Sequence, residues 1–329
     1  MLLYKNKIYH VGVRLKELRQ QRGLTLQDIA NKSGVSVDII SALELDEIQK
    51  LDNSDLLKII DSLNLNSAYD FLYLTKLNKH PLKFKAFNVG ILKTGTQSIA
   101  HIFDSYSSIH EFMFQETAGM VIKYNNGQIN KIEFVRFLKE RNARGCLEMD
   151  SANVNSFYVD ILAEEYPSAK FIFTIRDCFS WEDSLVNMYT HGVGGGPWVD
   201  DYTKLLFGFS QQVFNRMKKE RHLFLENIDK MLSYWESANE DILRKLPKGR
   251  SLIIKTNEIS HSIGRIADFI GVAETTLRKE VHKNKAIKKY RFLETFGLDV
   301  EDKFQRYCSK LMNRFFPNYT LKDYLKNDS

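Results

Sequence analysis

The amino-acid sequence predicts an α/β protein with a parallel sheet flanked by helices, preceded by a small all-α domain. From Phe84 onward, short apolar runs alternate with long amphipathic segments, which is the pattern of βαβ units. Residues 1–75 instead show helical periodicity and no convincing strand. With 329 residues, 43% of them hydrophobic, the chain is long enough to bury one large core or two unequal ones.

The predicted domains are residues 1–75 and 85–329, joined by a linker at 76–84. The linker is expected there because Thr75–Lys85, "TKLNKHPLKFK", is lysine-rich and contains a proline. In the second domain, apolar runs predict five strands, at Phe84–Leu92, Ile109–Phe114, Gly145–Asp150, Ala169–Arg176 and Ser251–Thr256.

Composition narrows the classes of function. The net charge of +6 favours an anionic ligand without requiring nucleic acid. No run approaches the roughly 20 apolar residues of a membrane span, so we expect a cytoplasmic protein without a membrane partner. The three cysteines have neither disulfide-framework nor metal-ligand spacing, which predicts reduced thiols and no metal site. The sequence is compatible with a homo-oligomer and does not define its size.

The stretch Val13–Glu44, "VRLKELRQQRGLTLQDIANKSGVSVDIISALE", resembles the Cro/repressor-like helix-turn-helix domains of bacteria. Gly34 would turn the chain and Ser36 would cap the recognition helix. The core faces are expected at Leu15, Leu18, Leu26, Ile29 and Ala30.

The predicted recognition helix has few side chains suited to reading DNA. It carries Asp38 and Glu44 where Arg, Lys, Asn or Gln would contact base edges. Residues 1–80 contain 11 Lys and Arg and 10 Asp and Glu, which gives little driving force from counterion release. A helical module used for dimerisation, for capping the enzyme or for partner docking is therefore favoured over DNA binding.

A turn with two glycines, "VGILKTGTQS" at Val89–Ser98, follows the first predicted strand and opens a helix. Gly90 and Gly95 have the spacing of a Walker A loop, but the lysine comes earlier, at Lys93. A triphosphate cradle is therefore disfavoured. The backbone N–H groups from Lys93 to Gln97 are instead expected to bind another anion at the helix N-terminus, helped by the hydroxyls of Thr94, Thr96 and Ser98.

A second anion-binding pair is expected after the strand Ala169–Arg176. Arg176 ends that strand, and Ser184 follows about two helical turns later. A guanidinium fork and a hydroxyl so placed can converge on one phosphate. Ligands of parallel sheets bind at the carboxyl ends of the strands, where Lys93 and Arg176 would both lie.

With these two motifs in hand, the chain resembles the sulfotransferases that use 3′-phosphoadenosine 5′-phosphosulfate (PAPS). "LKTGTQS" is similar to their 5′-phosphosulfate loop, and the Arg176–Ser184 pair to their 3′-phosphate site. The resemblance implies a P-loop NTPase-like sulfotransferase fold, with PAPS as donor and no metal. It implies donor binding by Lys93, Thr94, Gly95, Thr96, Gln97, Ser98, Arg176 and Ser184, and less specifically by Lys285 and Lys288 in the basic segment Val281–Phe292.

The implied reaction is transfer of a sulfuryl group to a hydroxyl or amino group of a small-molecule acceptor, as in the tailoring of natural products. Lys93 would neutralise charge on the transferred group and the leaving phosphate. The general base is left open among Glu111, His110 and Asp150, and strand alternation predicts that only one of the first two faces the site. The loop His191–Trp198 would close over the acceptor. The alternatives are a transcriptional regulator whose α/β domain senses a nucleotide, or a small-molecule kinase.

Overall fold

The structure is a computed structural model of the chain. It describes residues 2–4, 7–9, 12–45, 47, 51–63, 82–145, 147–190, 197–217, 219–279 and 292–327. Two compact units are present, one formed by Met1–Lys83 with Leu138–Cys146 and one by Phe84–Phe137 with Leu147–Ser329. Most of the expected linker, residues 76–81, lies outside the described residues. Each unit is considered by itself.

The described residues of the first unit up to Leu63 form the helices α1 (Gly12–Gln21), α2 (Leu26–Ser33), α3 (Val37–Glu44) and α4 (Asn53–Ser62). It also contains an antiparallel pair of strands, β1 (Leu2–Tyr4) and β2 (Lys7–Tyr9). The expectation of no strand in this region was therefore wrong. Strands of three residues are too short to show the alternating pattern on which sequence assignment depends.

The expected helix-turn-helix is formed by α2, the turn at Gly34, and α3. Gly34 has a φ of 70°, a left-handed conformation that ends α2. The Ser36 hydroxyl accepts a hydrogen bond from the N–H of Ile39 and caps α3. Of the expected core residues, Leu15, Leu18, Ile29 and Ala30 are buried, and Leu26 is half-buried.

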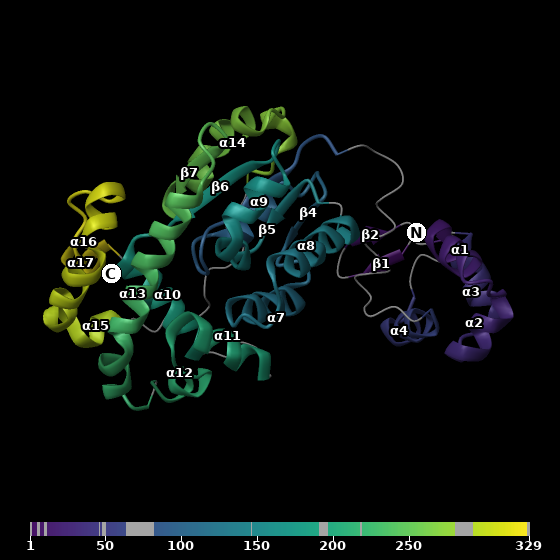
Figure 1. The fold of residues 1–329 in the computed structure, drawn as a ribbon, viewed down its shortest axis with the longest axis horizontal. Helices are drawn as coiled ribbons and strands as arrows, with labels where there is room; N and C mark the ends of the chain where they lie inside the picture. The colour runs from purple at the N-terminus through teal and green to yellow at the C-terminus, as the bar shows by residue number, and fades with distance from the viewer. Residues whose placement is uncertain are drawn as a thin grey trace. The chain divides into compact units, whose positions relative to one another are not determined.

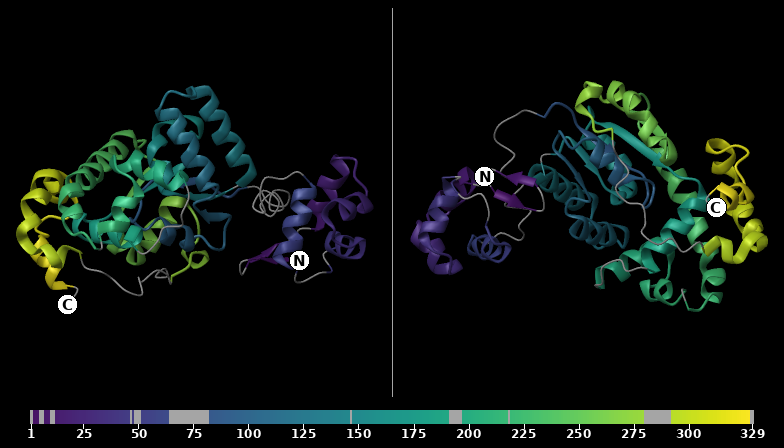
Figure 2. Two further views of the ribbon diagram at one scale, coloured as in Figure 1. Left: turned by 90° about the horizontal axis from the view of Figure 1, so that it is seen from below. Right: turned by 180° about the vertical axis from the view of Figure 1, so that it is seen from behind.

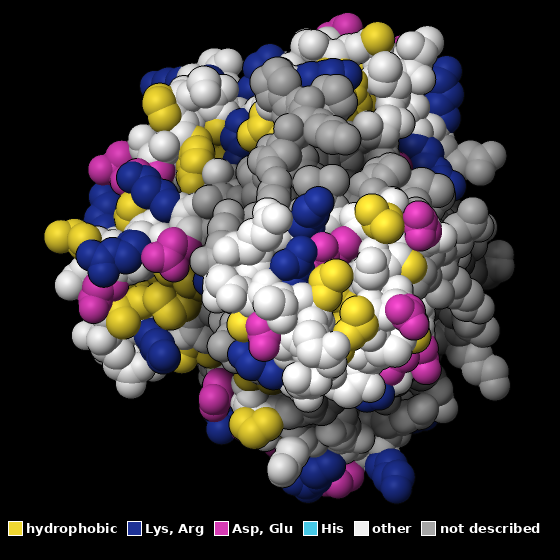
Figure 3. Space-filling model, turned by 90° about the vertical axis from the view of Figure 1, so that its right-hand side faces the viewer, with side chains coloured by type: hydrophobic (Ala, Val, Ile, Leu, Met, Phe, Trp, Pro, Cys, Tyr) yellow, Lys and Arg dark blue, Asp and Glu magenta, His cyan; other side chains and the backbone are white. Residues whose placement is uncertain are grey.

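Charges of both signs are mixed in this unit. Glu44, on the predicted recognition helix, forms a bidentate ion pair with Arg19 of α1, with distances of 2.6 and 2.9 Å. On the face of the molecule drawn in Figure 3, Lys and Arg side chains of the described residues are interspersed with Asp and Glu and form no continuous stripe. Glu44 thus stabilises the packing of α1 on α3.

The second unit is built on a five-stranded parallel sheet with the order β4-β5-β3-β6-β7 (Figure 1). The strands are β3 (Ala86–Asn88), β4 (Ser108–His110), β5 (Met149–Ser151), β6 (Lys170–Ile175) and β7 (Ser251–Lys255). Phe87 of the central strand lies in register between Asp150 and Phe171. The predicted parallel sheet is confirmed.

Helical segments connect the strands and cover both faces of the sheet (Figure 2). Between β3 and β6 they are α6 (Thr96–Ile102), α7 (Phe114–Asn125), α8 (Lys131–Gly145), η1 (Asn153–Tyr158) and α9 (Val159–Glu165). Residues 138–145 of α8 are assigned to the first unit. Between β6 and β7 they are α10 (Cys178–Thr190), α11 (Pro197–Phe207), α12 (Gln211–Met217) and α13 (His222–Lys245). After β7 come η2 (Thr256–Ser262), α14 (Ile263–Ile270), η3 (Glu274–Thr276), α15 (Phe292–Phe296), η4 (Gly297–Val300), α16 (Glu301–Phe315) and α17 (Leu321–Asn327).

Alternate residues of the strands pack on opposite faces of the sheet. On one face, strand residues join α6 and α14 in a buried cluster that includes Ala86, Met149, Ile172, Ile254, Ile99, Ile102, Ile263, Ile266 and Ile270. The spacing of the three α14 isoleucines gives that helix one apolar face. On the other face, the ring of Phe87 contacts Phe171 and Tyr166. Burying one such aliphatic side chain stabilises the fold by about 1.5–3 kcal/mol.

The composition led us to expect reduced cysteines and no membrane-spanning segment. Cys178 and Cys308 are buried free thiols, and Cys146 lies outside the described residues. In the described part of the chain, no helix combines the length and apolar character needed to cross a bilayer.

Candidate functional site

The loop between β3 and α6 is shaped by two glycines. A Cβ at Gly90 would lie 2.1 Å from Thr174 Oγ1 and 2.4 Å from Thr94 Oγ1, so no side chain fits there. Gly95 has a φ of 98°, a left-handed conformation that only glycine adopts readily, and its carbonyl accepts the first hydrogen bond of α6, from Ile99. The loop therefore turns sharply from the sheet into the helix.

The first turn of α6 lines a cavity of about 740 Å³ at the carboxyl ends of the strands. Gly95, Thr96, Gln97 and Ser98, all expected at the site, lie along its wall. The first N–H groups of a helix have no acceptor within the helix and favour a bound anion. Thr94 is an exception, because its buried hydroxyl donates to Ile91 O (2.7 Å) and does not reach the cavity.

Lys93 lines the same cavity from the loop. Burial lowers the pKa of Lys93 from its ordinary value, the nearby Arg176 lowers it further, and Glu111 opposes both effects. Its φ of 65° is unusual for a residue other than glycine. Such backbone strain often marks a functional position.

Arg176 follows β6, and its side chain connects the loop between β3 and α6 with α10 along the cavity wall. Its Nη1 donates to Lys93 O (3.2 Å) and its Nε donates to Ser180 Oγ (2.8 Å). Its own carbonyl accepts from Trp235 Nε1 (3.1 Å). The guanidinium is thus oriented by both the loop and the helix, and Ser184 lines the cavity on the same helix.

Ser180 is a cavity residue that the sequence reasoning missed. It lies one helical turn before Ser184, on the same face of α10, so the spacing of four residues was the available signal. Asp177 accepts hydrogen bonds from both the N–H (2.8 Å) and the hydroxyl of Ser180. Asp177 and Ser180 together restrict the rotamer of Arg176.

His110 and Glu111 both line the cavity, so the prediction that only one of them faces the site was wrong. The predicted strand Ile109–Phe114 ends at His110, Glu111 takes a left-handed φ of 57°, and α7 begins at Phe114. Alternation does not apply beyond the strand end. Phe112 is buried, and Phe114 lines the cavity.

The two candidate bases differ in their contacts. His110 Nε2 is hydrogen-bonded to Thr96 Oγ1 (3.0 Å), and 3.7 Å separate it from Glu111 Oε1. The pKa of His110 is lowered, chiefly by burial, with His101 and Lys93 adding to the effect and Glu111 opposing it. His110 therefore favours the neutral form.

Of three other expected residues, the structure describes one, Asp150. Asp150 is buried in β5, where its Oδ1 lies 3.4 Å from Asn155 Nδ2, and it does not line the cavity. Lys285 and Lys288 lie outside the described residues. The same is true of residues 191–196 of the expected lid, although Trp198, at its end, lines the cavity.

An aromatic wall faces the anion-binding side. The Phe114 ring makes edge-to-face contacts with Trp198 (5.7 Å between centroids) and Tyr202 (5.4 Å). Met188, Tyr189 and Val199 complete this wall. Asn153, from η1, lies between the wall and Glu111 and was also missed, because no local pattern distinguishes it. The cavity thus has an anion-binding half, an apolar half, and Glu111 with His110 between them.

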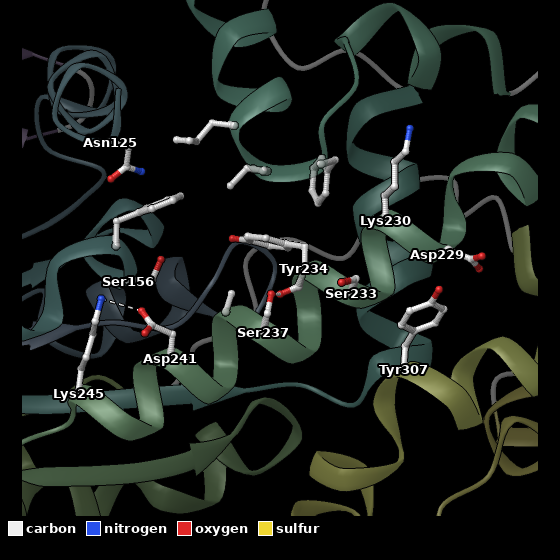
Figure 4. Close-up of a pocket in the computed structure, with 15 residues that line it drawn as sticks. Asn125, Ser156, Asp229, Lys230, Ser233, Tyr234, Ser237, Asp241, Lys245 and Tyr307 are labelled. Atoms are coloured by element: carbon white, nitrogen blue, oxygen red, sulfur yellow. Dashed lines mark hydrogen bonds and ion pairs between the residues drawn. The ribbon is translucent and has the colours of Figure 1, made fainter. Parts of the chain in front are cut away.

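A second cavity, of about 810 Å³, lies along α13 (Figure 4). It contains none of the motif residues, and Lys245 within it is paired with Asp241 (2.7 Å). Although this cavity is slightly larger and is lined by Lys230 and by several hydroxyl groups, neither anion-binding motif contributes to it, so volume alone does not identify the site.

Comparison with known proteins agrees with these features. A family model described as a sulfotransferase domain matches residues 85–286, and one described as a helix-turn-helix domain matches residues 12–77. No curated protein matches the chain. Among solved structures, the crystal structure of sulfotransferase STF9 from Mycobacterium avium is similar, with 12% sequence identity, a TM-score of 0.41, and coverage of 96% of this chain and 99% of that chain. Because the sulfotransferase model covers more than half of the sequence, the chain belongs to the sulfotransferase domain family.

Proposed function

We propose that the protein transfers a sulfuryl group from PAPS to a hydroxyl or amino group of a small molecule, in the tailoring of a natural product. The observation that carries the proposal is the hydrogen bond from Arg176 to the carbonyl of Lys93, which joins the two anion-binding motifs in one cavity. Lys93 and Arg176 both line this cavity, and two neighbouring cations suit a ligand with more than one anionic group.

The donor would bind along the polar half of the cavity. The ammonium of Lys93 and the N–H groups of Gly95 and Thr96 face the 5′-phosphosulfate, with Gln97 and Ser98 beside it. The guanidinium of Arg176 and the hydroxyl of Ser184 bind the 3′-phosphate, and Ser180 orients the guanidinium. Lys285 and Lys288 remain predicted ligands.

In the proposed reaction the acceptor atom attacks sulfur in line, a new bond to sulfur forms, and the bond from sulfur to the phosphate oxygen breaks. 3′-Phosphoadenosine 5′-phosphate (PAP) leaves with the electron pair of that bond. Lys93 stabilises the negative charge that develops on the bridging oxygen. Its neighbours Arg176 and Glu111 fix the local charge balance.

Glu111 is the proposed general base. It lies between the anion-binding half and the aromatic wall, where the reacting hydroxyl or amine must lie, and its carboxylate can accept the proton that the acceptor loses. His110, the alternative, already has its Nε2 in a hydrogen bond with Thr96. The acceptor itself would pack on Phe114 and Trp198, so it should present an apolar face next to its nucleophile.

We also propose that the helix-turn-helix unit, assigned to residues 1–75, contacts protein partners more than DNA. Arg19 is already paired with Glu44, so its charge is partly neutralised before any DNA binds. Asp38 lies in the first turn of α3, where its carboxylate would repel a DNA phosphate. The sulfotransferase domain would then comprise residues 85–329.

Isothermal titration with PAP tests the donor site, with ATP and magnesium, and a nonspecific DNA duplex, as competing ligands. Micromolar binding of PAP is expected, with a large loss in Arg176→Ala and none in Arg216→Ala, because Arg216 is an exposed arginine that pairs with Glu220 and does not line the cavity. PAPS is then incubated with a panel of phenols, alcohols and amines, and products are detected by mass spectrometry as acceptors that have gained one SO₃. Binding of ATP or DNA without PAP would support the kinase or the regulator instead.

A further inference from the structure

We propose that Asn153 and Tyr202 are positioning residues that orient Glu111 and link its orientation to the occupied acceptor site. This inference rests on the proposed function and adds two residues to it. Neither residue belongs to the donor motifs, and they come from η1 and α11, far from Glu111 in the sequence.

The three side chains form a continuous chain of hydrogen bonds. Asn153 Nδ2 donates to Glu111 Oε1 (2.7 Å), and the Tyr202 hydroxyl donates to Asn153 Oδ1 (2.6 Å). The directions of both bonds follow from the carboxylate. Because a carboxylate only accepts hydrogen bonds, the amide nitrogen of Asn153 must face Glu111, and the amide oxygen must therefore accept from the Tyr202 hydroxyl. The network thus fixes the amide so that its N–H₂ group points at Glu111.

Burial keeps this chain intact. Asn153 and Tyr202 are 6% and 4% exposed, so water competes little for their bonds. Burial also raises the pKa of Tyr202 well above its ordinary value, with Tyr234, Tyr189 and Glu111 adding to the effect. The Tyr202 hydroxyl therefore stays protonated and remains a donor throughout the physiological range.

Glu111 needs such support because its backbone is strained. The N–H of Glu111 donates to Ser151 O (3.0 Å), but its φ of 57° directs the side chain away from the strand pattern. A carboxylate on an irregular turn would otherwise sample several rotamers. Asn153 selects the one in which Oε1 lies near His110 and the cavity.

Tyr202 also belongs to the aromatic wall. Its ring contacts Phe114, and its helix supplies Trp198 and Val199 to the cavity. An acceptor that packs on this wall would therefore restrain Tyr202, and through Asn153 it would restrain the carboxylate of Glu111. Acceptors that fill the wall should be turned over faster than equally reactive ones that do not.

The test is a double-mutant cycle. Tyr202→Phe, Asn153→Ala and Glu111→Gln are made singly, and the first two are also combined with Glu111→Gln. Initial rates of PAP release from PAPS are measured with the best acceptor of the panel, and PAP affinity is measured by titration. Tyr106→Phe is the matched control, because its hydroxyl also bonds a side chain, Thr276 Oγ1 (2.6 Å), but lies outside the cavity.

Tyr202→Phe keeps the ring and should lower kcat about 3- to 10-fold, the effect of one hydrogen bond, with PAP affinity unchanged. In the Glu111→Gln background, Tyr202→Phe and Asn153→Ala should have less than about a twofold effect, because they act through Glu111. Tyr106→Phe should match the wild type.

Other results would overturn the inference. Three results would show that the hydrogen-bond chain does not act through Glu111. These are a wild-type rate in Tyr202→Phe, an equal loss of rate in the wild-type and Glu111→Gln backgrounds, and weaker PAP binding in Tyr202→Phe. Full activity of Glu111→Gln would do the same. If the wild type binds PAP but consumes no PAPS with any acceptor, the proposed function itself fails, and this inference fails with it.

Discussion

Replacing Arg176 by lysine separates charge from geometry at the proposed 3′-phosphate site. The guanidinium donates at once to Ser180 Oγ and to Lys93 O, and its remaining N–H groups can face a phosphate. A lysine keeps the positive charge, but it lacks the planar array of N–H groups that can donate to Ser180, to Lys93 and to a phosphate at the same time. The loss of one charge-assisted hydrogen bond, about 1.5–3 kcal/mol, corresponds to roughly 10- to 150-fold weaker PAP binding.

Titration calorimetry with PAP measures this loss, and Arg250→Lys is the matched control. Arg250 also forms a fork of hydrogen bonds, to Ala169 O (2.9 Å), Tyr166 O (3.1 Å) and Ala163 O (3.2 Å), but it does not line the cavity. Arg250→Lys should lower stability and leave PAP affinity unchanged. Unaltered affinity in Arg176→Lys, or an equal loss in both variants, would refute the assignment.

Three further predictions concern the proposed catalytic lysine, the loop between β3 and α6, and the core. Lys93→Ala should lower kcat by at least about a hundredfold while the folded state persists, as measured by PAP release and circular dichroism. Gly90→Ala should abolish PAP binding in titrations, because the added Cβ meets Thr174 Oγ1 at 2.1 Å and displaces the loop. Glu182 is buried, neither of its carboxyl oxygens has a hydrogen-bond partner among the described residues, and burial, aided by Asp183, raises its pKa well above the ordinary value. The contribution of Glu182 to the free energy of unfolding is thus fully present below pH about 4.5. It is lost as pH rises, on the order of 1 kcal/mol per pH unit, because the unfolded state releases the carboxyl proton at a lower pH than the folded state does. Glu182→Gln should therefore stabilise the protein more at pH 8 than at pH 5 in urea unfolding, and equal effects at both values would contradict this account.

The elements that the sequence predicted well have local signals. The loop at Gly90 and Gly95 was recognisable because glycines are needed for its close approach and its left-handed turn, and both requirements are met. Arg176 and Ser184 were identified from a strand end and a helical spacing, and both line the cavity. Features that depend on the identity of one residue, or on regular spacing along a strand or helix, can therefore be predicted without a structure.

Apart from Ser180, the residues that were missed or whose orientation was not predicted depend on contacts between distant segments. Asn153 gains its role from Tyr202 and Glu111, which are 49 and 42 positions away. Glu111 could not be oriented from a strand pattern, because a positive φ at a residue other than glycine is a tertiary effect. Asp150 looked suitable because it follows an apolar run, but its side chain is buried beside Asn155.

The order of the strands has a consequence for how the protein folds. The central strand β3 pairs with β5 and β6, so both of its neighbours are made later in the chain than β4. Val89, at the start of the donor loop, is anchored by its N–H to Ile172 O of β6 (3.0 Å). Pairings this distant in sequence form slowly, because closing the long intervening loop costs chain entropy before the strands can pair. We therefore expect PAP binding to appear only in the last phase of refolding, which would make the nucleotide a reporter of the completed sheet.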